Sequence, residues 1–310
     1  MGGFVTRVLA FTCSISVLTP VLSAQQQTTF TSAVDLVHFG VSVVDKHGEP
    51  VTGLTRDDFE IVENGTKQSM RFFAAGEPDN APPLHLGLLL DTSESMADDL
   101  NDARGAAIKF VNQVSPASDV TLVDFDTEVR VARFGPESYP RLVERIRARK
   151  ADGMTALYDA IGVYLQGAQG QDGRKILVVY TDGGDTTSSL TFQDALDMLK
   201  ASDVTVYAIG YTEHEGSGSR FMKQRADLEQ FAKLTGGLAV FPASGRDLDA
   251  AFENIRKQIA ARYALGYISS DQTANGAWRN VEIRLLRKDL KGAKLRTRAG
   301  YFAPYKEGSR

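Results

Sequence analysis

The hydrophobic residues near the start of the chain alternate with polar or small ones. Every second residue across 37–43 is apolar, which is the period-two pattern of a half-buried strand. Two further strand-like stretches, 59–63 and 68–73, flank Asn64-Gly65. This dipeptide favours a tight hairpin turn because both residues tolerate positive φ. The first part of the chain is therefore expected to be antiparallel β-structure.

After the breaker-rich run 77–83, apolar strands alternate with helical patterns. The strands are apolar almost throughout, which indicates burial on both faces, as in a parallel sheet covered by helices. The predicted strands are 86–90, 120–125, 176–180, 204–209 and 238–241, and helical spacing is clearest over 100–114, 157–165 and 248–259. Strand 129–134 follows its predecessor too closely for a crossover, so we expect an antiparallel hairpin at one edge of the sheet.

Beyond Arg262 the period-two pattern returns, over 263–267, 281–285 and 294–298. Each flank has on the order of 45 residues, near the size below which a lone core is rarely sufficient. We therefore expect the two flanks to pair into one discontinuous β-sandwich with the α/β domain inserted; independent mini-domains are the alternative. The predicted segments are 25–83 and 263–310 for the sandwich and 84–262 for the α/β domain.

The last segment is locally basic, and its basic residues are Arg284, Arg287, Lys288, Lys291, Lys294, Arg296 and Arg298. We interpret it as the solvated face of an edge strand, which charge protects from aggregation. A surface for a partner or an anion is the alternative.

The first residues resemble a secretory signal peptide. Arg7 precedes an uncharged, mostly apolar stretch, 8–22, and cleavage is expected near Ala24, so residues 1–24 would be removed. A membrane anchor is the alternative, but the stretch is shorter than the roughly 20 residues of a spanning helix and Pro20 interrupts it. The protein is thus expected to be secreted or to reside in the periplasm or cell envelope. Cys13, the only cysteine, would leave with the signal.

Composition narrows the function classes. The 310 residues are 43% hydrophobic and 24% charged, as in globular proteins. A formal charge of −4 without a long basic block argues against nucleic-acid binding. The histidines are scattered, and no zinc-site spacing is found.

Hard oxygen ligands gather where the strand 86–90 ends. Asp91, Ser93 and Ser95 offer one carboxylate and two hydroxyls at alternating positions, which suits a small divalent cation. Asp182 follows another strand, and Thr155 begins a predicted helix.

In open α/β sheets, ligands bind beyond the carboxyl ends of the strands. If the two strands are neighbours, they lie roughly 4.8 Å apart, so both carboxylates can approach one ion. Two carboxylates balance a divalent cation without saturating it, and we expect an open position for a partner's carboxylate.

These residues resemble the metal-ion-dependent adhesion site (MIDAS) of the von Willebrand factor type A (VWFA) domain, which has the pattern Asp-x-Ser-x-Ser, a distant Thr and a distant Asp. The likeness covers roughly 84–262, including Thr235-Gly236-Gly237. It implies a doubly wound, mostly parallel sheet. It also implies that Ser93 and Ser95 bind Mg²⁺ directly, and that Asp91, Thr155 and Asp182 bind it directly or through water. Mn²⁺ and Ca²⁺ are alternatives.

Two details qualify the resemblance. Glu94 stands where many members carry Gly, which adds bulk and negative charge beside the metal loop. The flanks resemble the bacterial VWFA-related proteins first described as an acidobacterial family, through Val51-Thr52-Gly53-Leu54-Thr55 with Asp58-Phe59, and Gly300-Tyr301-Phe302-Ala303-Pro304.

The sequence thus predicts a non-enzymatic, extracytoplasmic protein that captures an acidic side chain of a protein partner through bound Mg²⁺. One alternative is an assembly protein whose metal is structural. Another is a Mg²⁺-dependent phosphohydrolase with Asp91 as nucleophile, but Ser93 stands where that chemistry commonly has a second acid. We interpret Asp126 and Asp185, also on the metal side, as surface loop acids, with support of the metal ligands as the alternative.

Overall fold

The computed structural model describes Gly2 and residues 36–305, apart from 77–81, 115–116, 183 and 212–218. The predicted signal peptide, 1–24, lies outside the described residues except for Gly2. The part from residue 36 onwards belongs to one compact unit. Within the described ranges, every helix is too short or too polar to cross a membrane.

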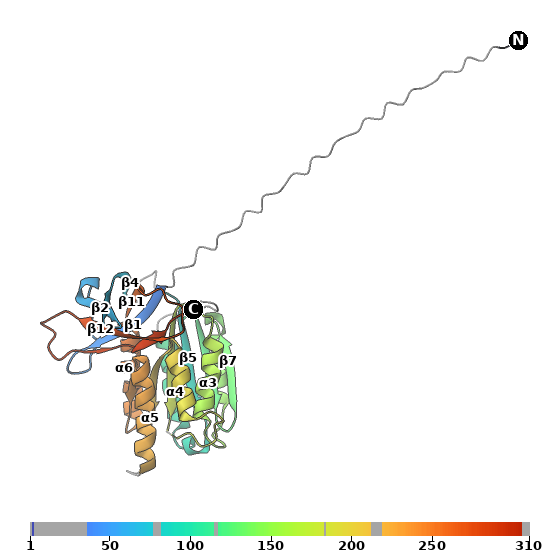
Figure 1. The fold of residues 1–310 in the computed structure, drawn as a ribbon. Helices are drawn as coiled ribbons and strands as arrows, with labels where there is room; N and C mark the ends of the chain where they lie inside the picture. The colour runs from blue at the N-terminus through green and yellow to red at the C-terminus, as the bar shows by residue number, and fades with distance from the viewer. Residues whose placement is uncertain are drawn as a thin grey trace. The chain divides into compact units, whose positions relative to one another are not determined.

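A six-stranded sheet forms the centre of the α/β part (Figure 1). Its order is β10 (Leu238–Val240), β9 (Thr205–Gly210), β8 (Arg174–Thr181), β5 (Leu84–Asp91), β6 (Asp119–Phe125) and β7 (Val129–Phe134). All neighbours are parallel except β6 and β7, which pair antiparallel at one edge. The predicted edge hairpin and the mostly parallel sheet are therefore confirmed.

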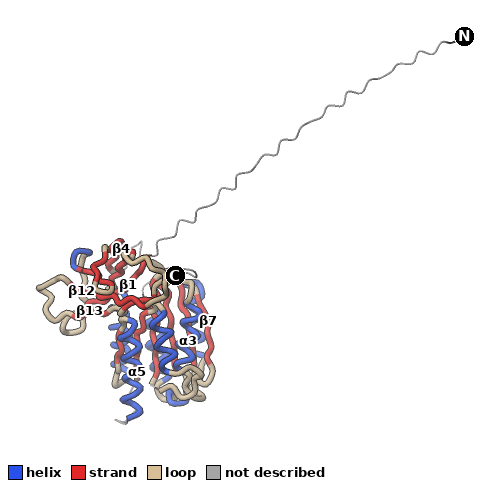
Figure 2. The backbone as a smooth tube through the Cα atoms, in the orientation of Figure 1, coloured by secondary structure: helices blue, strands red, loops and turns tan. Residues whose placement is uncertain are grey.

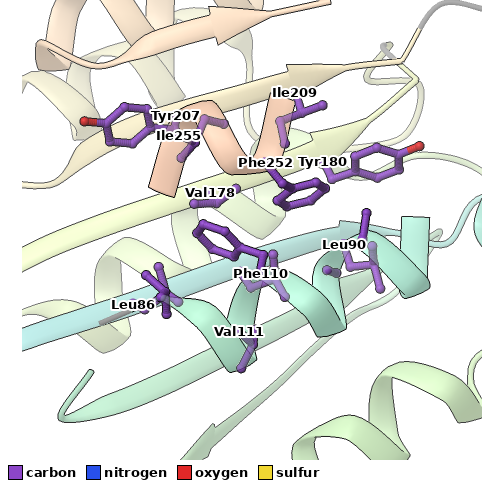
Figure 3. Close-up of a cluster of buried hydrophobic side chains, with 14 of the residues drawn as sticks. Leu86, Leu90, Phe110, Val111, Val178, Tyr180, Tyr207, Ile209, Phe252 and Ile255 are labelled. Atoms are coloured by element: carbon purple, nitrogen blue, oxygen red, sulfur yellow. The ribbon is translucent and has the colours of Figure 1, made fainter. Parts of the chain in front are cut away.

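Helices cover both faces of this sheet because its strands carry apolar side chains on both sides. One core cluster joins α1 (Leu100–Gln113), α2 (Tyr139–Ala148) and α6 (Gly245–Ala260) to one face. Figure 3 shows Phe110 of α1 and Phe252 of α6 against Val178 and Tyr180 of the sheet. The opposite face packs on α3 (Leu157–Ala168), α4 (Phe192–Ala201) and α5 (Ser219–Thr235).

The two flanks of the chain build a second, antiparallel layer pair. One sheet has the order β13 (Lys294–Arg296), β1 (Leu36–Val44), β11 (Tyr263–Ile268) and β4 (Met70–Ala75). The other has the order β14 (Gly300–Phe302), β12 (Trp278–Leu285), β2 (Phe59–Glu63) and β3 (Thr66–Gln68). Each sheet contains strands from both flanks, and one apolar cluster, with Phe39, Ile61 and Leu265, lies in its core. This is the expected β-sandwich with an inserted α/β part; the limits given above for each segment stay a prediction.

The turn at Asn64-Gly65 is confirmed, with φ values of 46° and 83° between β2 and β3. The single strand predicted over 68–73 is not. It is divided between β3 and β4, which belong to different sheets, so the chain crosses the sandwich near residue 69. Local alternation continues through such a crossing and gives no sign of it.

Two arginines join the sandwich to the α/β part. Arg262 donates to Gly40 O at 2.9 Å and to Thr205 Oγ1 at 3.0 Å, and thereby links β1 to β9. A side chain at position 40 would collide with this guanidinium. Arg298 donates to His38 O at 2.9 Å and to Ser202 O at 3.3 Å.

The interpretation of the basic segment as a solvated face is confirmed for five of its seven residues, which are exposed, and is wrong for Arg296 and Arg298. β13 is an edge strand as expected, and Lys294 is exposed. Arg296, however, is half-buried and donates to Gln258 Oε1 of α6 at 3.0 Å. Arg298 lies over the ring of Phe39, 4.6 Å from its centroid. The α/β part covers the face that the pattern assigned to water.

Candidate metal site at the carboxyl edge of the sheet

The register of two neighbouring strands places the predicted ligands at one edge. β5 and β8 are hydrogen-bonded in parallel, with Leu90 level with Tyr180. Asp91 is therefore level with Thr181, and Asp182 follows directly. The adjacency assumed from the sequence is confirmed. Figure 2 shows loops at the end of the α/β part away from the sandwich, and the colour of Figure 1 places the segment that follows β5 among them.

Asp91 is completely buried, and both of its oxygens accept hydrogen bonds. Oδ1 accepts from the Ser93 backbone N–H at 2.9 Å, and Oδ2 accepts from the Thr181 hydroxyl at 2.5 Å. Burial, with the negative charge of Asp182 as the second cause, raises the pKa of Asp91 to about 7. Among the described residues, no positively charged side chain offsets the charge of this carboxylate when it is ionised.

Two hydroxyls converge beside this carboxylate. The Oγ atoms of Ser93 and Ser95 lie 3.1 Å apart. Ser93 is buried, whereas Ser95 is exposed, so the pair extends from the interior to the surface. A short 3₁₀ turn, Glu94–Met96, fixes this geometry, because Met96 is fully buried beneath it.

The loop that carries Thr155 is hydrogen-bonded to both of the other loops. The Glu94 N–H donates to Gly153 O at 3.0 Å, and the Asp152 N–H donates to Thr92 O at 2.9 Å. On the other side, the N–H of Thr155 itself donates to Thr186 Oγ1 at 2.9 Å, and Thr155 is buried. Three segments far apart in sequence therefore meet at this edge.

The neighbouring acids Asp126 and Asp185 have structural partners. Asp126 is buried and pairs with Arg130 at 2.8 Å, so its interpretation as a surface acid is wrong. Asp185 is half-buried, and its Oδ2 accepts from the N–H of Tyr158 in the first turn of α3 at 3.0 Å. A carboxylate at a helix N-terminus accepts a hydrogen bond from a free N–H and is attracted to the positive end of the helix dipole.

Two residues that support the site were not predicted from the sequence, Thr181 and Asp124. Thr181 orients Asp91, and the only signal for it was its place one residue before Asp182. Asp124 is fully buried at the end of β6 and pairs with Arg145 at 2.9 Å and Arg149 at 2.8 Å. An acid inside the apolar run 120–125 was the available signal. Arg149 leads into the Thr155 loop, so Asp124 anchors the start of that loop.

The donor set fits a hard divalent cation. It consists of oxygen atoms only, two carboxylates and three hydroxyls, which is the chemistry that Mg²⁺, Mn²⁺ and Ca²⁺ prefer. No three His, Cys, Asp or Glu side chains in the described parts of the chain are grouped to hold a metal. A cation at this edge would therefore depend on hydroxyls for three of its five expected protein ligands, and its charge would offset the repulsion between Asp91 and Asp182.

Comparison with protein families is consistent with this geometry. The model of the von Willebrand factor type A domain matches residues 85–258, which is more than half of the chain. The chain belongs to the von Willebrand factor type A family. The sheet order and the three loops described above are those of its VWFA domain. A comparison with curated proteins gives no significant match.

Solved structures with a similar fold include a bacterial pilin and a bacterial pilus adhesin. The PilB minor pilin of Streptococcus sanguinis is 14% identical, with a TM-score of 0.50 over 60% of this chain and 63% of its own. The pilus adhesin SpaC of Lactobacillus rhamnosus GG is 11% identical, with a TM-score of 0.50 over 82% of this chain and 49% of its own. A von Willebrand factor type A protein of Catenulispora acidiphila is 13% identical, with a TM-score of 0.49 over 90% and 76%. At these identities the likeness concerns the fold.

Proposed function

We propose that this VWFA protein binds a protein partner through a divalent cation, Mg²⁺ in the first place. The cation would be held by Asp91, Ser93, Ser95, Thr155 and Asp182. It supplies a Lewis-acidic centre with a free position, and an Asp or Glu carboxylate of the partner would take that position. The observation that carries the proposal is the convergence of a buried carboxylate, two hydroxyls 3.1 Å apart and a second acid on adjacent strand ends.

The graded exposure of these residues supports a site that is open on one side. Asp91 and Ser93 are buried, Asp182 is half-buried and Ser95 is exposed. Most of the expected ligands thus come from the interior, and the accessible side beside Ser95 is left to a partner. Met154, next to Thr155, is 53% exposed and would contact a partner beside the partner's carboxylate.

We propose binding rather than catalysis. A phosphohydrolase that uses Asp91 as nucleophile needs an accessible carboxylate oxygen for attack on phosphorus. Asp91 has no exposed surface, and its two oxygens accept hydrogen bonds from the Ser93 N–H and the Thr181 hydroxyl. In-line attack on phosphorus needs a carboxylate exposed to a bulky group, whereas a small cation needs only the lone pairs that remain on the Asp91 oxygens beside the Ser93 and Ser95 hydroxyls.

We also propose that the protein works outside the cytoplasm, in the periplasm or cell envelope or as a secreted protein. The signal-like pattern of residues 1–24 supports this, and PilB and SpaC are a pilin and a pilus adhesin. The match with each spans less than two thirds of that protein, so a role in a pilus is not carried over.

Affinity capture tests the proposed function. The immobilised full chain is exposed to cell-surface extract with Mg²⁺ or with chelator, and the retained proteins are compared between wild type and Ser95→Ala. Ser189→Ala, an exposed serine outside the site, serves as the matched control. Partners should be retained by wild type and Ser189→Ala with Mg²⁺ only, and lost from Ser95→Ala. Retention that persists in chelator and in Ser95→Ala would refute the proposal.

A further inference from the structure

A second concave site lies where the sandwich meets the α/β part. Two hollows, of about 400 and 430 Å³, both include Lys175 and Asp203 in their lining. We call them together the junction cleft. Their volumes fall within the range of small-molecule sites, roughly 300–1,000 Å³.

The junction cleft is positively charged, although the chain as a whole carries −4. Five basic side chains and two acidic ones are among its described lining residues. The basic residues are Arg174, Lys175, Lys200, Arg262 and Arg298, and the acidic ones are Asp172 and Asp203. A concave, partly desolvated surface of one sign concentrates ions of the other sign.

Within the described residues, three of these cations make no ion pair with a carboxylate. Lys175 pairs with Asp203 at 2.7 Å. Arg262 and Arg298, by contrast, donate only to carbonyl and hydroxyl oxygens within the described ranges. Lys200 places its ammonium over the ring of Trp278, 4.6 Å from the centroid. These contacts solvate the cations, and the single carboxylate of Asp203 acts on both Lys175 and Arg298, so an entering anion would gain the attraction that remains.

Apolar or aromatic residues make up half of the lining of the second hollow. Leu165, Met198, Tyr301 and Phe302 line it beside Lys200 and Arg298, and the side chain of Phe302 is 45% exposed. A bare inorganic anion would leave this apolar surface in contact with water. A ligand that combines an anionic head group with an apolar body would use both parts of the cleft.

We propose that the junction cleft binds a small amphiphilic anion, a carboxylate or phosphate monoester attached to an apolar group. Lys175, Lys200 and Arg298 would face the head group. The cleft is independent of the proposed metal site, because Arg174 and Lys175 begin β8 whereas Thr181 ends it. At about 3.3 Å per residue, the two ends of this strand are roughly 20 Å apart.

Titration calorimetry in the presence of chelator tests this proposal on the full chain. The probes are hexanoate and hexyl phosphate, and the matched uncharged probe is hexanamide. The variant is Lys200→Gln, and its control is Lys233→Gln, the same change in the last turn of α5 at an exposed position outside the cleft. Asp91→Ala separates the cleft from the metal site.

At least one anionic probe should bind with a stoichiometry of one, and hexanamide should bind at least tenfold more weakly. Lys200→Gln should weaken binding about fivefold or more, while Lys233→Gln and Asp91→Ala leave it unchanged. Binding of one anion only would identify its head group. The proposal would be overturned if neither anion binds or if hexanamide binds as tightly as the anions. A second variant, Lys175→Met, is measured as well, and an unchanged affinity in both Lys200→Gln and Lys175→Met would also overturn it. The chelator keeps failure here distinct from failure of the proposed metal-dependent function.

Discussion

Asp91→Asn is expected to stabilise the metal-free protein, which is the reverse of the usual effect of a buried substitution. The pKa of Asp91 is raised from 3.8 to about 7 in the folded chain, mainly by burial and then by Asp182. The folded state therefore binds this proton more tightly than the unfolded chain, and the stability of wild type falls as the pH rises from about 4 through about 7. Each pKa unit corresponds to about 1.4 kcal/mol, so the penalty at pH 8 is about 4 kcal/mol.

Asparagine removes the charge but can keep both hydrogen bonds. Its carbonyl accepts from the Ser93 N–H, and its amide donates to the Thr181 hydroxyl oxygen, which accepts as readily as it donates. Without metal, Asp91→Asn should therefore raise the free energy of unfolding by about 4 kcal/mol at pH 8 and by little at pH 4. Mg²⁺ at 100 times its Kd should add about 2.7 kcal/mol to wild type and nothing to the variant.

Urea unfolding at pH 4, 6 and 8, with chelator and with Mg²⁺, measures both effects. Asp98→Asn, an exposed acid on the same loop, is the control and should match wild type in every condition. If Asp91→Asn destabilises the metal-free protein equally at all three pH values, the argument from the buried charge is wrong. If Mg²⁺ stabilises Asp91→Asn as much as wild type, Asp91 is not a ligand.

Three further substitutions test the framework around the sites by urea unfolding in chelator. Asp124→Asn hardly changes the side-chain volume but leaves three arginines without their shared carboxylate, so it should lower the free energy of unfolding by about 3 kcal/mol. A loss below about 1 kcal/mol would contradict this expectation. Gly236→Ala should lower the free energy of unfolding by more than about 2 kcal/mol, because φ is +76° and the added Cβ meets the Thr297 backbone. Its control, Gly105→Ala on the open face of α1, should raise the free energy of unfolding by about 0.5–1 kcal/mol. Equal effects of the two changes would refute the argument. Tyr267→Phe removes a 2.6 Å hydrogen bond to the buried Glu63 in the sandwich and should cost about 1–3 kcal/mol, and a neutral result would show that this bond contributes nothing net.

Local patterns in the sequence were sufficient for most elements. Continuous apolar strands predicted a sheet covered on both faces, and the short connection between β6 and β7 predicted the antiparallel edge. Asn64-Gly65 predicted its turn from backbone preference alone. The five expected metal ligands could be named because four of them end or follow strands and Thr155 precedes a helix, in a recognisable order, and their role as ligands stays a prediction.

Tertiary structure decided what no local pattern encodes. The register of β5 against β8 brings Thr181 under Asp91, and the neighbour order of strands is set by contacts between residues about 90 positions apart. The alternation of β13 indicated a two-faced strand but could not say which face meets water. Arg298 lies between the two parts, where it donates to His38 O of the sandwich and to Ser202 O of the α/β part. Sequence period fixes which side chains share a face, whereas only the packing of distant segments fixes what that face touches.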